Sequence, residues 1–147
     1  MSKFYLLSLT ENNVKFFKVD HNDIQEIRIE NMPHNIDEAV GAKAIEKQLQ
    51  THQGASTQEG IHHGHKDDTD FQRNHLETFQ RKVDHAVAAY MQGMDEPLML
   101  ATVEKTFGLY KQLSTYPNLL TKKFLHGNCD KIKNKELQEK AWEVFKF

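Results

Sequence analysis

A long amphipathic pattern in residues 69–91 constrains the fold of this chain more than any other feature. Apolar residues recur there every three or four positions, which is the spacing of one face of an α-helix. Thr69 and Gln72 have the spacing of a capping box, so the helix is predicted to begin at Thr69. Such a helix runs roughly 33 Å at ~1.5 Å per residue, and can therefore cross the whole face of a small sheet.

Shorter apolar runs on both sides of this helix predict the sheet. Strands are expected at residues 3–9, 14–19, 24–30 and 98–103, with a short one around Phe124 and Leu125, and helices at 104–114 and 135–145. Residues 35–50 fit either a short helix or, in their later part, a polar strand. The order predicts one α/β domain over residues 1–147, with a mixed sheet that begins as a three-strand meander. Whether it is a complete protein or a fragment of a longer multidomain one stays open.

Composition limits the classes of function. The formal net charge is −2, so no overall basic field points to nucleic acid. Cys129 is the single cysteine, which excludes an internal disulfide and suits a reducing cytoplasm. The N-terminal apolar run is too short for a signal peptide or a membrane span, so a cytoplasmic protein without a membrane association is expected.

The segment before the helix, residues 51–68, is predicted to be a long loop. It contains His52, His62, His63 and His65 together with Gly54, Gly60 and Gly64. Loops of this length in compact domains are usually functional or disordered. The segment has little apolar bulk to bury. We therefore expect the loop to carry the chemistry or the binding contact, with a solvated loop as the plain alternative.

Two groups of residues in the sequence are candidates for chemistry, one for metal binding in the loop and one for nucleophilic catalysis near Cys129. His63 and His65, with Asp67, are candidate metal ligands, because a His-x-His pair on an extended segment can bind one ion. The metal signal is weak because HExxH and paired CxxC motifs are absent, and no cofactor is predicted. Cys129 close to His126 is a remoter candidate nucleophile.

A lysine-rich stretch follows near the C-terminus. Between residues 121 and 135 the lysines are Lys122, Lys123, Lys131, Lys133 and Lys135, against a single acidic residue, Asp130. If these side chains lie on one edge, they can contact phosphate groups of nucleic acid. The alternative is an ordinary solvated face.

The order of motifs resembles the bacterial members of the archaeo-eukaryotic release-factor family. The similarity is carried by FYLLSLTENNVKFFKVD (residues 4–20), QLQTHQGAS (48–56), HHGHKDD (62–68), PLMLATVEKTFGLYKQLSTYPNLL (97–120), HGNCDKI (126–132) and ELQEKAWEVF (136–145). The segments 97–120 and 141–145 are the most specific, and together these stretches span nearly the whole chain.

The resemblance implies an RNase H-like α/β fold of the translational-machinery type. In release factors, the loop before the long helix carries a Gly-Gly-Gln tripeptide that positions water for peptidyl-tRNA hydrolysis. This chain has no Gly-Gly-Gln; the matching region contains Gly60, Gly64 and the histidines instead. If there is catalysis, a peptidyl-tRNA hydrolase-like activity with His62, His63 and His65 as proton-transfer groups is expected.

Three functions are compatible with the sequence. The leading hypothesis is a ribosome- or tRNA-associated factor related to release, rescue or hibernation. It would bind RNA through the 51–68 loop, including Gly60 and Gly64, and through Lys122, Lys123, Lys131 and Lys133. The alternatives are a metal-dependent hydrolase using the histidine cluster, and a non-catalytic protein-interaction domain, which a homodimer in solution would favour.

Overall fold

The computed structural model describes residues 3–40, 60–127 and 132–146, with the backbone alone for residues 60–73. Its core is a five-stranded mixed sheet in the order β3-β2-β1-β4-β5. The strands are β1 (Lys3–Leu9), β2 (Val14–Asp20), β3 (Ile24–Ile27), β4 (Leu98–Thr102) and β5 (Leu125–His126). The helices are α1 (Ile36–Val40), α3 (Gly60–Tyr90), α4 (Glu104–Leu113) and α5 (Asn134–Lys146). The predicted α/β class and the mixed sheet are therefore confirmed.

Two kinds of strand pairing meet at β1. It pairs antiparallel with β2, and β2 pairs antiparallel with β3, which makes the predicted meander. On its other side β1 pairs parallel with β4, and β4 pairs parallel with β5. Parallel neighbours need a crossover connection; α3 precedes β4 and α4 joins β4 to β5. The long helix predicted from the apolar stripe is therefore a crossover helix.

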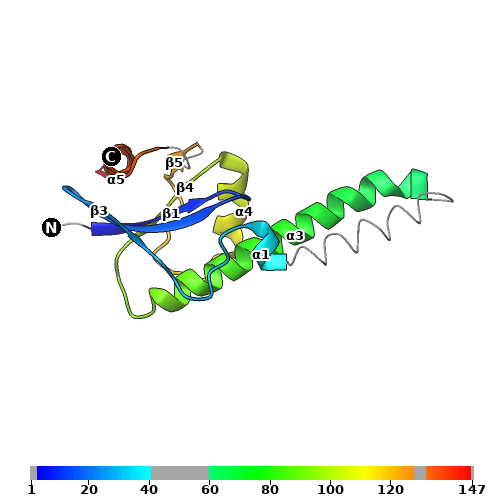
Figure 1. Ribbon diagram of the computed structural model, residues 1–147, viewed down its shortest axis with the longest axis horizontal. Helices are drawn as coiled ribbons and strands as arrows, with labels where there is room; N and C mark the ends of the chain where they lie inside the picture. Colours follow the sequence, from blue (N-terminus) through cyan, green and yellow to red (C-terminus); the bar gives the residue numbers. More distant parts are fainter. Residues whose placement is uncertain (1–2, 41–59, 128–131, 147) are drawn as a thin grey trace.

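The sheet is covered on both faces (Figure 1). α3 and α4 lie on one face and α5 on the other. This explains why β1 and β4 read as continuous apolar runs rather than alternating ones, since both faces of each strand are buried. On the α5 face the contact is aromatic: the Phe4 ring stacks on Phe145 at a centroid distance of 4.2 Å. Among the described residues, no helix combines the length and apolar character that a bilayer crossing needs.

The turn between β2 and β3 is held by a carboxylate. Asp20 Oδ1 accepts hydrogen bonds from the backbone N–H of Asn22 at 2.8 Å and of Asp23 at 2.7 Å. The bond from Asn22 is the main cause that lowers the pKa of Asp20. Short polar side chains that bond the backbone two or three residues on favour turns over regular structure, which explains why the chain reverses here.

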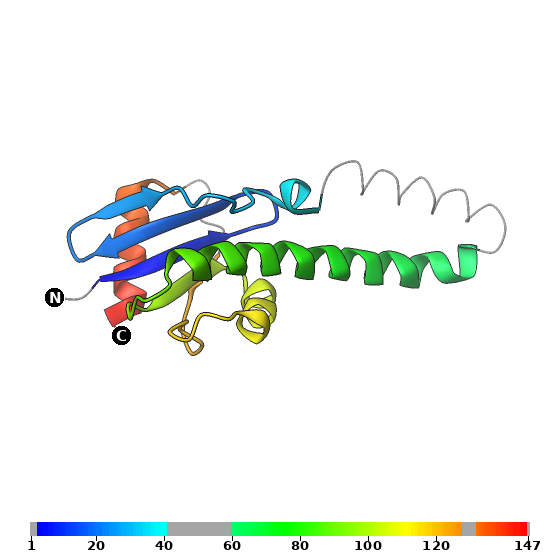
Figure 2. The same cartoon turned by 90° about the horizontal axis from the view of Figure 1, so that it is seen from below.

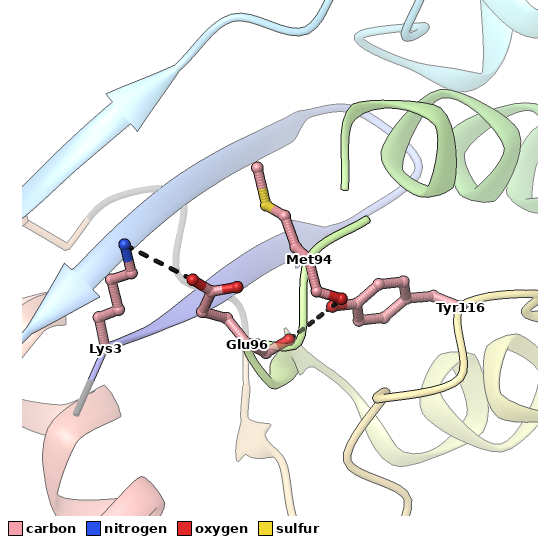
Figure 3. A network of polar contacts seen from close by, with 4 residues as sticks. All are labelled: Lys3, Met94, Glu96 and Tyr116. Atoms are coloured by element: carbon pink, nitrogen blue, oxygen red, sulfur yellow. Dashed lines mark hydrogen bonds and ion pairs between the residues drawn. The ribbon is translucent and has the colours of Figure 1, made fainter. Parts of the chain in front are cut away.

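A second polar group fixes the connection between α3 and β4 (Figure 3). The Tyr116 hydroxyl donates to the backbone oxygen of Glu96 at 2.6 Å and lies 3.3 Å from that of Met94. The Glu96 carboxylate lies 3.5 Å from Lys3 Nζ on β1. Burial is the first cause that raises the pKa of Tyr116, so its hydroxyl remains a neutral donor. These contacts tie the chain after α3 to the start of the sheet.

Most predicted elements have the expected bounds, and two differ. β3 ends at Ile27 instead of Glu30, because Ile29 and Met32 pack into the main core, and the chain turns between them at Asn31, which has a left-handed backbone with φ of 68°. α3 begins at Gly60 instead of Thr69. Of residues 35–50, the structure describes 35–40, and their helical part, α1, fits the first of the two expected forms.

Candidate functional site

The candidate site predicted from the sequence lies at the N-terminal end of α3. Figure 2 shows that this end of the helix extends well beyond the edge of the sheet and past α1. We call the extending segment, residues 60–73, the α3 arm. α1 packs against α3 near the base of the arm, where Lys82 Nζ donates to the backbone oxygen of Ala39. From Gly60 to Phe79, which is buried in the core, the helix axis covers roughly 28 Å.

The helical backbone corrects the expectation of a loop over residues 60–68. All these residues belong to α3, and Thr69 lies inside the helix, so the predicted capping box is wrong. Positions 63 and 65 are two residues apart, which places them roughly 200° apart around a helix. An extended His-x-His pair is therefore not the geometry here. Positions 63 and 67, by contrast, are separated by about one turn. The remaining part of the predicted loop, residues 51–59 with His52, lies outside the described residues.

The roles assigned to these positions stay predictions. The structure gives the backbone of Gly60, Gly64 and the histidines at 62, 63 and 65, and this backbone places them together on the arm. Where side chains are described, no group of three or more His, Cys, Asp or Glu is arranged to hold a metal. The candidate ligands His63, His65 and Asp67 do not belong to that set of side chains, and Cys129 and Lys131 lie outside the described residues.

The C-terminal half of α3 packs on the sheet and is called its body end. It is fixed by a buried carboxylate that was not predicted from the sequence. Asp84 is 3% exposed and accepts four hydrogen bonds from the end of α4 and the residues after it. The donors are Tyr110 Oη at 3.2 Å, Ser114 Oγ at 2.7 Å, Thr115 Oγ1 at 2.8 Å and the Thr115 backbone N–H at 2.8 Å. A buried carboxylate is stable when it is hydrogen-bonded in this way. We call Asp84 with its three donor residues, Tyr110, Ser114 and Thr115, the Asp84 group. This group links α3 to α4.

Tyr110 shows the electrostatic consequence of this arrangement. Burial raises the pKa of its hydroxyl well above the usual value, and the adjacent Asp84 charge raises it further. The hydroxyl therefore stays protonated and continues to donate to the carboxylate. In sequence, Asp84 follows the apolar Val83 on the buried side of the helix, and a charged residue at such a place is a signal that could have indicated this contact.

One turn before Asp84, the amide of Gln80 is a second buried polar group. Gln80 is fully buried, and neither its Nε2 nor its Oε1 has a hydrogen-bond partner in the described part of the chain. Buried polar side chains usually have a hydrogen-bond partner, and a buried polar group without one lowers the free energy of unfolding. The C-terminal half of α3 thus combines one well-satisfied polar group with one unsatisfied group.

The structure divides the predicted lysine patch. Lys122 is exposed, as are Lys133 and Lys135 close to the start of α5. Lys123 is instead partly buried: its Nζ donates to the backbone oxygen of Phe145 and lies 5.4 Å from the centre of the Phe145 ring. A lysine at the last carbonyls of a helix stabilises the helix end. Lys123 therefore has a structural contact, which does not test its predicted binding role.

A comparison with known proteins identifies the family of the chain. A search among curated proteins finds no match. A family model described as bacterial archaeo-eukaryotic release factor family 7 matches residues 4–146. This range includes the sheet, the α3 arm and α5. Because the match spans almost the whole chain, the protein belongs to family 7 of the bacterial archaeo-eukaryotic release factors.

Proposed function

We propose that this protein is a translation factor that binds the ribosome or tRNA and contacts RNA with the α3 arm. The observation that carries the proposal is the match to a release-factor family over residues 4–146, in a chain whose longest helix extends beyond its sheet. Membership of the family supports a role in translation. The specific RNA contact is the part that we infer from the shape of the molecule.

A projecting helix suits contact with a recessed site, because its backbone hydrogen bonds are satisfied internally. The Asp84 group and the apolar side chains of α3 hold the base of this helix against the sheet. An element fixed in this way can place its far end with little loss of conformational entropy on binding. The α3 arm therefore combines reach with a firm attachment.

The histidines at positions 62, 63 and 65 are the groups that we assign to the RNA contact. An imidazole group can donate a hydrogen bond when neutral and attract phosphate when protonated. Because the sequence contains no Gly-Gly-Gln, the water-positioning role of that tripeptide is not assigned to any matching residues here. If peptidyl-tRNA is hydrolysed, these imidazoles are the proposed proton-transfer groups.

Lysines on the body would add sequence-independent attraction to phosphate. Lys122 and Lys133 are exposed and available for this role. Lys131 is proposed from its sequence position, and Lys123 would have to leave its contact with Phe145 to take part fully. Such contacts make binding fall steeply with salt, since each neutralised phosphate releases counterions.

Co-sedimentation with purified bacterial ribosomes across a salt series tests the proposal. We compare the intact chain with a variant carrying His62→Ala, His63→Ala and His65→Ala, which keeps the helix because alanine has the highest helix propensity. His85→Ala, an exposed histidine on the same helix, is the matched control. Salt-sensitive binding that weakens at least about tenfold in the triple variant alone, equivalent to ~1.4 kcal/mol, is expected.

Two other results would contradict the proposal, one its ribosome or tRNA binding and the other the role of the histidines. Absence of ribosome binding at low salt, with tRNA also unbound, removes the proposed function. Equal binding of the intact chain and the triple variant leaves a ribosome factor but removes the assigned role of the histidines. A peptidyl-tRNA hydrolysis assay on ribosomes that bind the chain then decides whether a bond is cleaved.

A further inference from the structure

We propose that a cavity at the β2–β3 edge of the sheet binds the phosphate and sugar of a ribonucleotide, with Lys15 and Arg28 as the phosphate-binding residues. The inference deepens the proposed function, because it rests on RNA being the partner and names a contact on the body of the molecule. It does not depend on the histidines of the α3 arm.

The cavity exists because β3 stops early. The last pair of the β2–β3 ladder is Phe16 with Ile27. The chain then leaves β2, turns between Ile29 and Met32, and returns at His34, whose backbone oxygen accepts from Val14 N at 2.8 Å. Between these two attachment points an opening of about 210 Å³ separates β2 from the returning chain. Since a water takes up ≈ 30 Å³ of the liquid, this is room for roughly seven waters, or for a phosphate with its sugar.

The returning chain is held firmly, so the opening is preformed. Ile29 is 9% and Met32 is 5% exposed, and both pack into the main core. Asn31, between them in the turn, has a φ of 68°, a conformation that is uncommon outside glycine and tolerated best by Asn and Asp. Non-glycine residues with this backbone are found at turns and at functional sites. A fixed cavity binds a ligand without an ordering cost.

The charges around the opening favour an anion. Lys15 and Arg28 both line it, and neither side chain has an ion pair or hydrogen bond in the described part of the chain. The guanidinium of arginine matches the oxygens of a phosphate with two parallel N–H donors. His34 also lines the cavity and contacts Glu38 Oε1 at 3.2 Å, so it is partly engaged.

One acidic side chain selects between anionic ligands. Glu26 lines the same cavity and, like the two cations, has no partner where the structure is described. A carboxylate repels a bare phosphate but accepts hydrogen bonds from hydroxyl groups. A ribonucleotide supplies both, with phosphate oxygens for Lys15 and Arg28 and ribose hydroxyls for Glu26. The 2′-hydroxyl is also the group by which proteins distinguish RNA from DNA.

The cavity lies close enough to the α3 arm for one RNA to contact both. α1 follows directly after His34, and it packs against α3 near the base of the α3 arm. The backbone N–H of Ile36 also donates to Glu11 O in the turn before β2, which joins this corner to the sheet. An RNA that contacts the arm would thus find a phosphate-binding group on the neighbouring surface of the body.

Nuclear magnetic resonance of the 15N-labelled chain tests the site without ribosomes. Adenosine 5′-monophosphate is titrated, with adenosine and 2′-deoxyadenosine 5′-monophosphate in parallel. We expect saturable shifts of the amides of Lys15, Arg28 and His34 with adenosine 5′-monophosphate, weaker binding of the deoxynucleotide, and little response to adenosine. A double variant with Lys15→Gln and Arg28→Gln should bind at least about tenfold more weakly, whereas Lys18→Gln on the same strand should bind normally.

The inference is overturned if the nucleotide causes no saturable shift, if adenosine binds equally well, or if the double variant keeps the full affinity. Arg28→Gln alone, at an exposed position, repeats the test if the double variant is unstable. The experiments also distinguish a failure of the cavity site from a failure of the proposed function. Ribosome binding without nucleotide binding removes this cavity site alone, and nucleotide binding without ribosome or tRNA binding removes the proposed function alone.

Discussion

The two ends of α3 differ in what surrounds them. Its C-terminal half contributes Phe79, Val83, Val87 and the Asp84 group to the side of the sheet that it covers. Its N-terminal end, the α3 arm, extends past the sheet. One helix thus holds the fold together at one end and, in our proposal, carries function at the other. Changes at the body end should therefore affect stability, and changes on the arm should affect binding.

The largest effect is expected from Asp84→Ala. The substitution removes the acceptor of four hydrogen bonds and leaves the buried donors of Tyr110, Ser114 and Thr115 without a partner. We expect a loss of about 3–5 kcal/mol in the free energy of unfolding, measured by urea denaturation. Glu139→Ala, an exposed carboxylate on α5, should change it by less than about 0.5 kcal/mol. Equal effects of the two variants would contradict the role of the Asp84 group.

Tyr110→Phe should have a smaller effect that depends on pH. Losing one hydrogen bond costs about 1–2 kcal/mol near neutral pH, because Asp84 keeps its other donors. The folded pKa of Tyr110 is raised above the ordinary value of 10.0, so its stabilising contribution is complete below pH 10 and falls as the pH rises beyond it. Unfolding curves between pH 8 and pH 12 should therefore show a shallower alkaline loss in the variant than in the intact chain. A parallel loss in both would show that Tyr110 is not the titrating group.

Gln80→Met is expected to raise stability slightly. The unpaired amide is replaced by a side chain of similar size that needs no partner. Thermal and urea unfolding should show a gain of about 1 kcal/mol. Gln92→Met, at an exposed position just after the helix, is the control and should be nearly neutral. A marked destabilisation at position 80 would mean that its amide is satisfied in solution.

The smallest stability effect separates two neighbouring lysines. Lys123→Ala removes the contact with the last carbonyls of α5 and with the Phe145 ring, for an expected loss of about 0.5–1 kcal/mol. Lys122→Ala, next to it and exposed, should leave the unfolding free energy unchanged and weaken only RNA binding. If the two variants lose stability equally, the structural assignment of Lys123 is wrong.

The strands could be predicted because their signal is local. The alternating and continuous apolar runs gave β1 and β2 to within a residue of their observed ends. The start of α3 could not, since residues 60–68 are rich in glycine and histidine and lack an apolar stripe. Once a helix has formed against a core, each further residue adds a hydrogen bond at little cost, so a helix can continue beyond its apolar stripe.

The contacts that fix the body end of α3 were harder to predict. Asp84 meets Ser114 and Thr115 only through the packing of α3 on α4, with about thirty residues between the partners. The early end of β3 depends on how Ile29 and Met32 enter the core, which no pattern within that segment reveals. The candidate RNA-binding positions on the arm were predicted from the histidines and glycines of that segment. The cavity beside Lys15 was not predicted, because it is formed by residues from two strands and the returning chain.

The most direct test of the central claim is tethered cleavage of ribosomal RNA. An iron chelate is attached to a single cysteine introduced at the arm by Ile61→Cys or on the body by Glu139→Cys, each in a chain with Cys129→Ser. We predict strong cuts in ribosomal RNA from position 61 and weak or different cuts from position 139. Identical patterns from both positions, or no cuts from position 61 in complexes that sediment with the ribosome, would contradict the claim that the α3 arm is the RNA-contacting element.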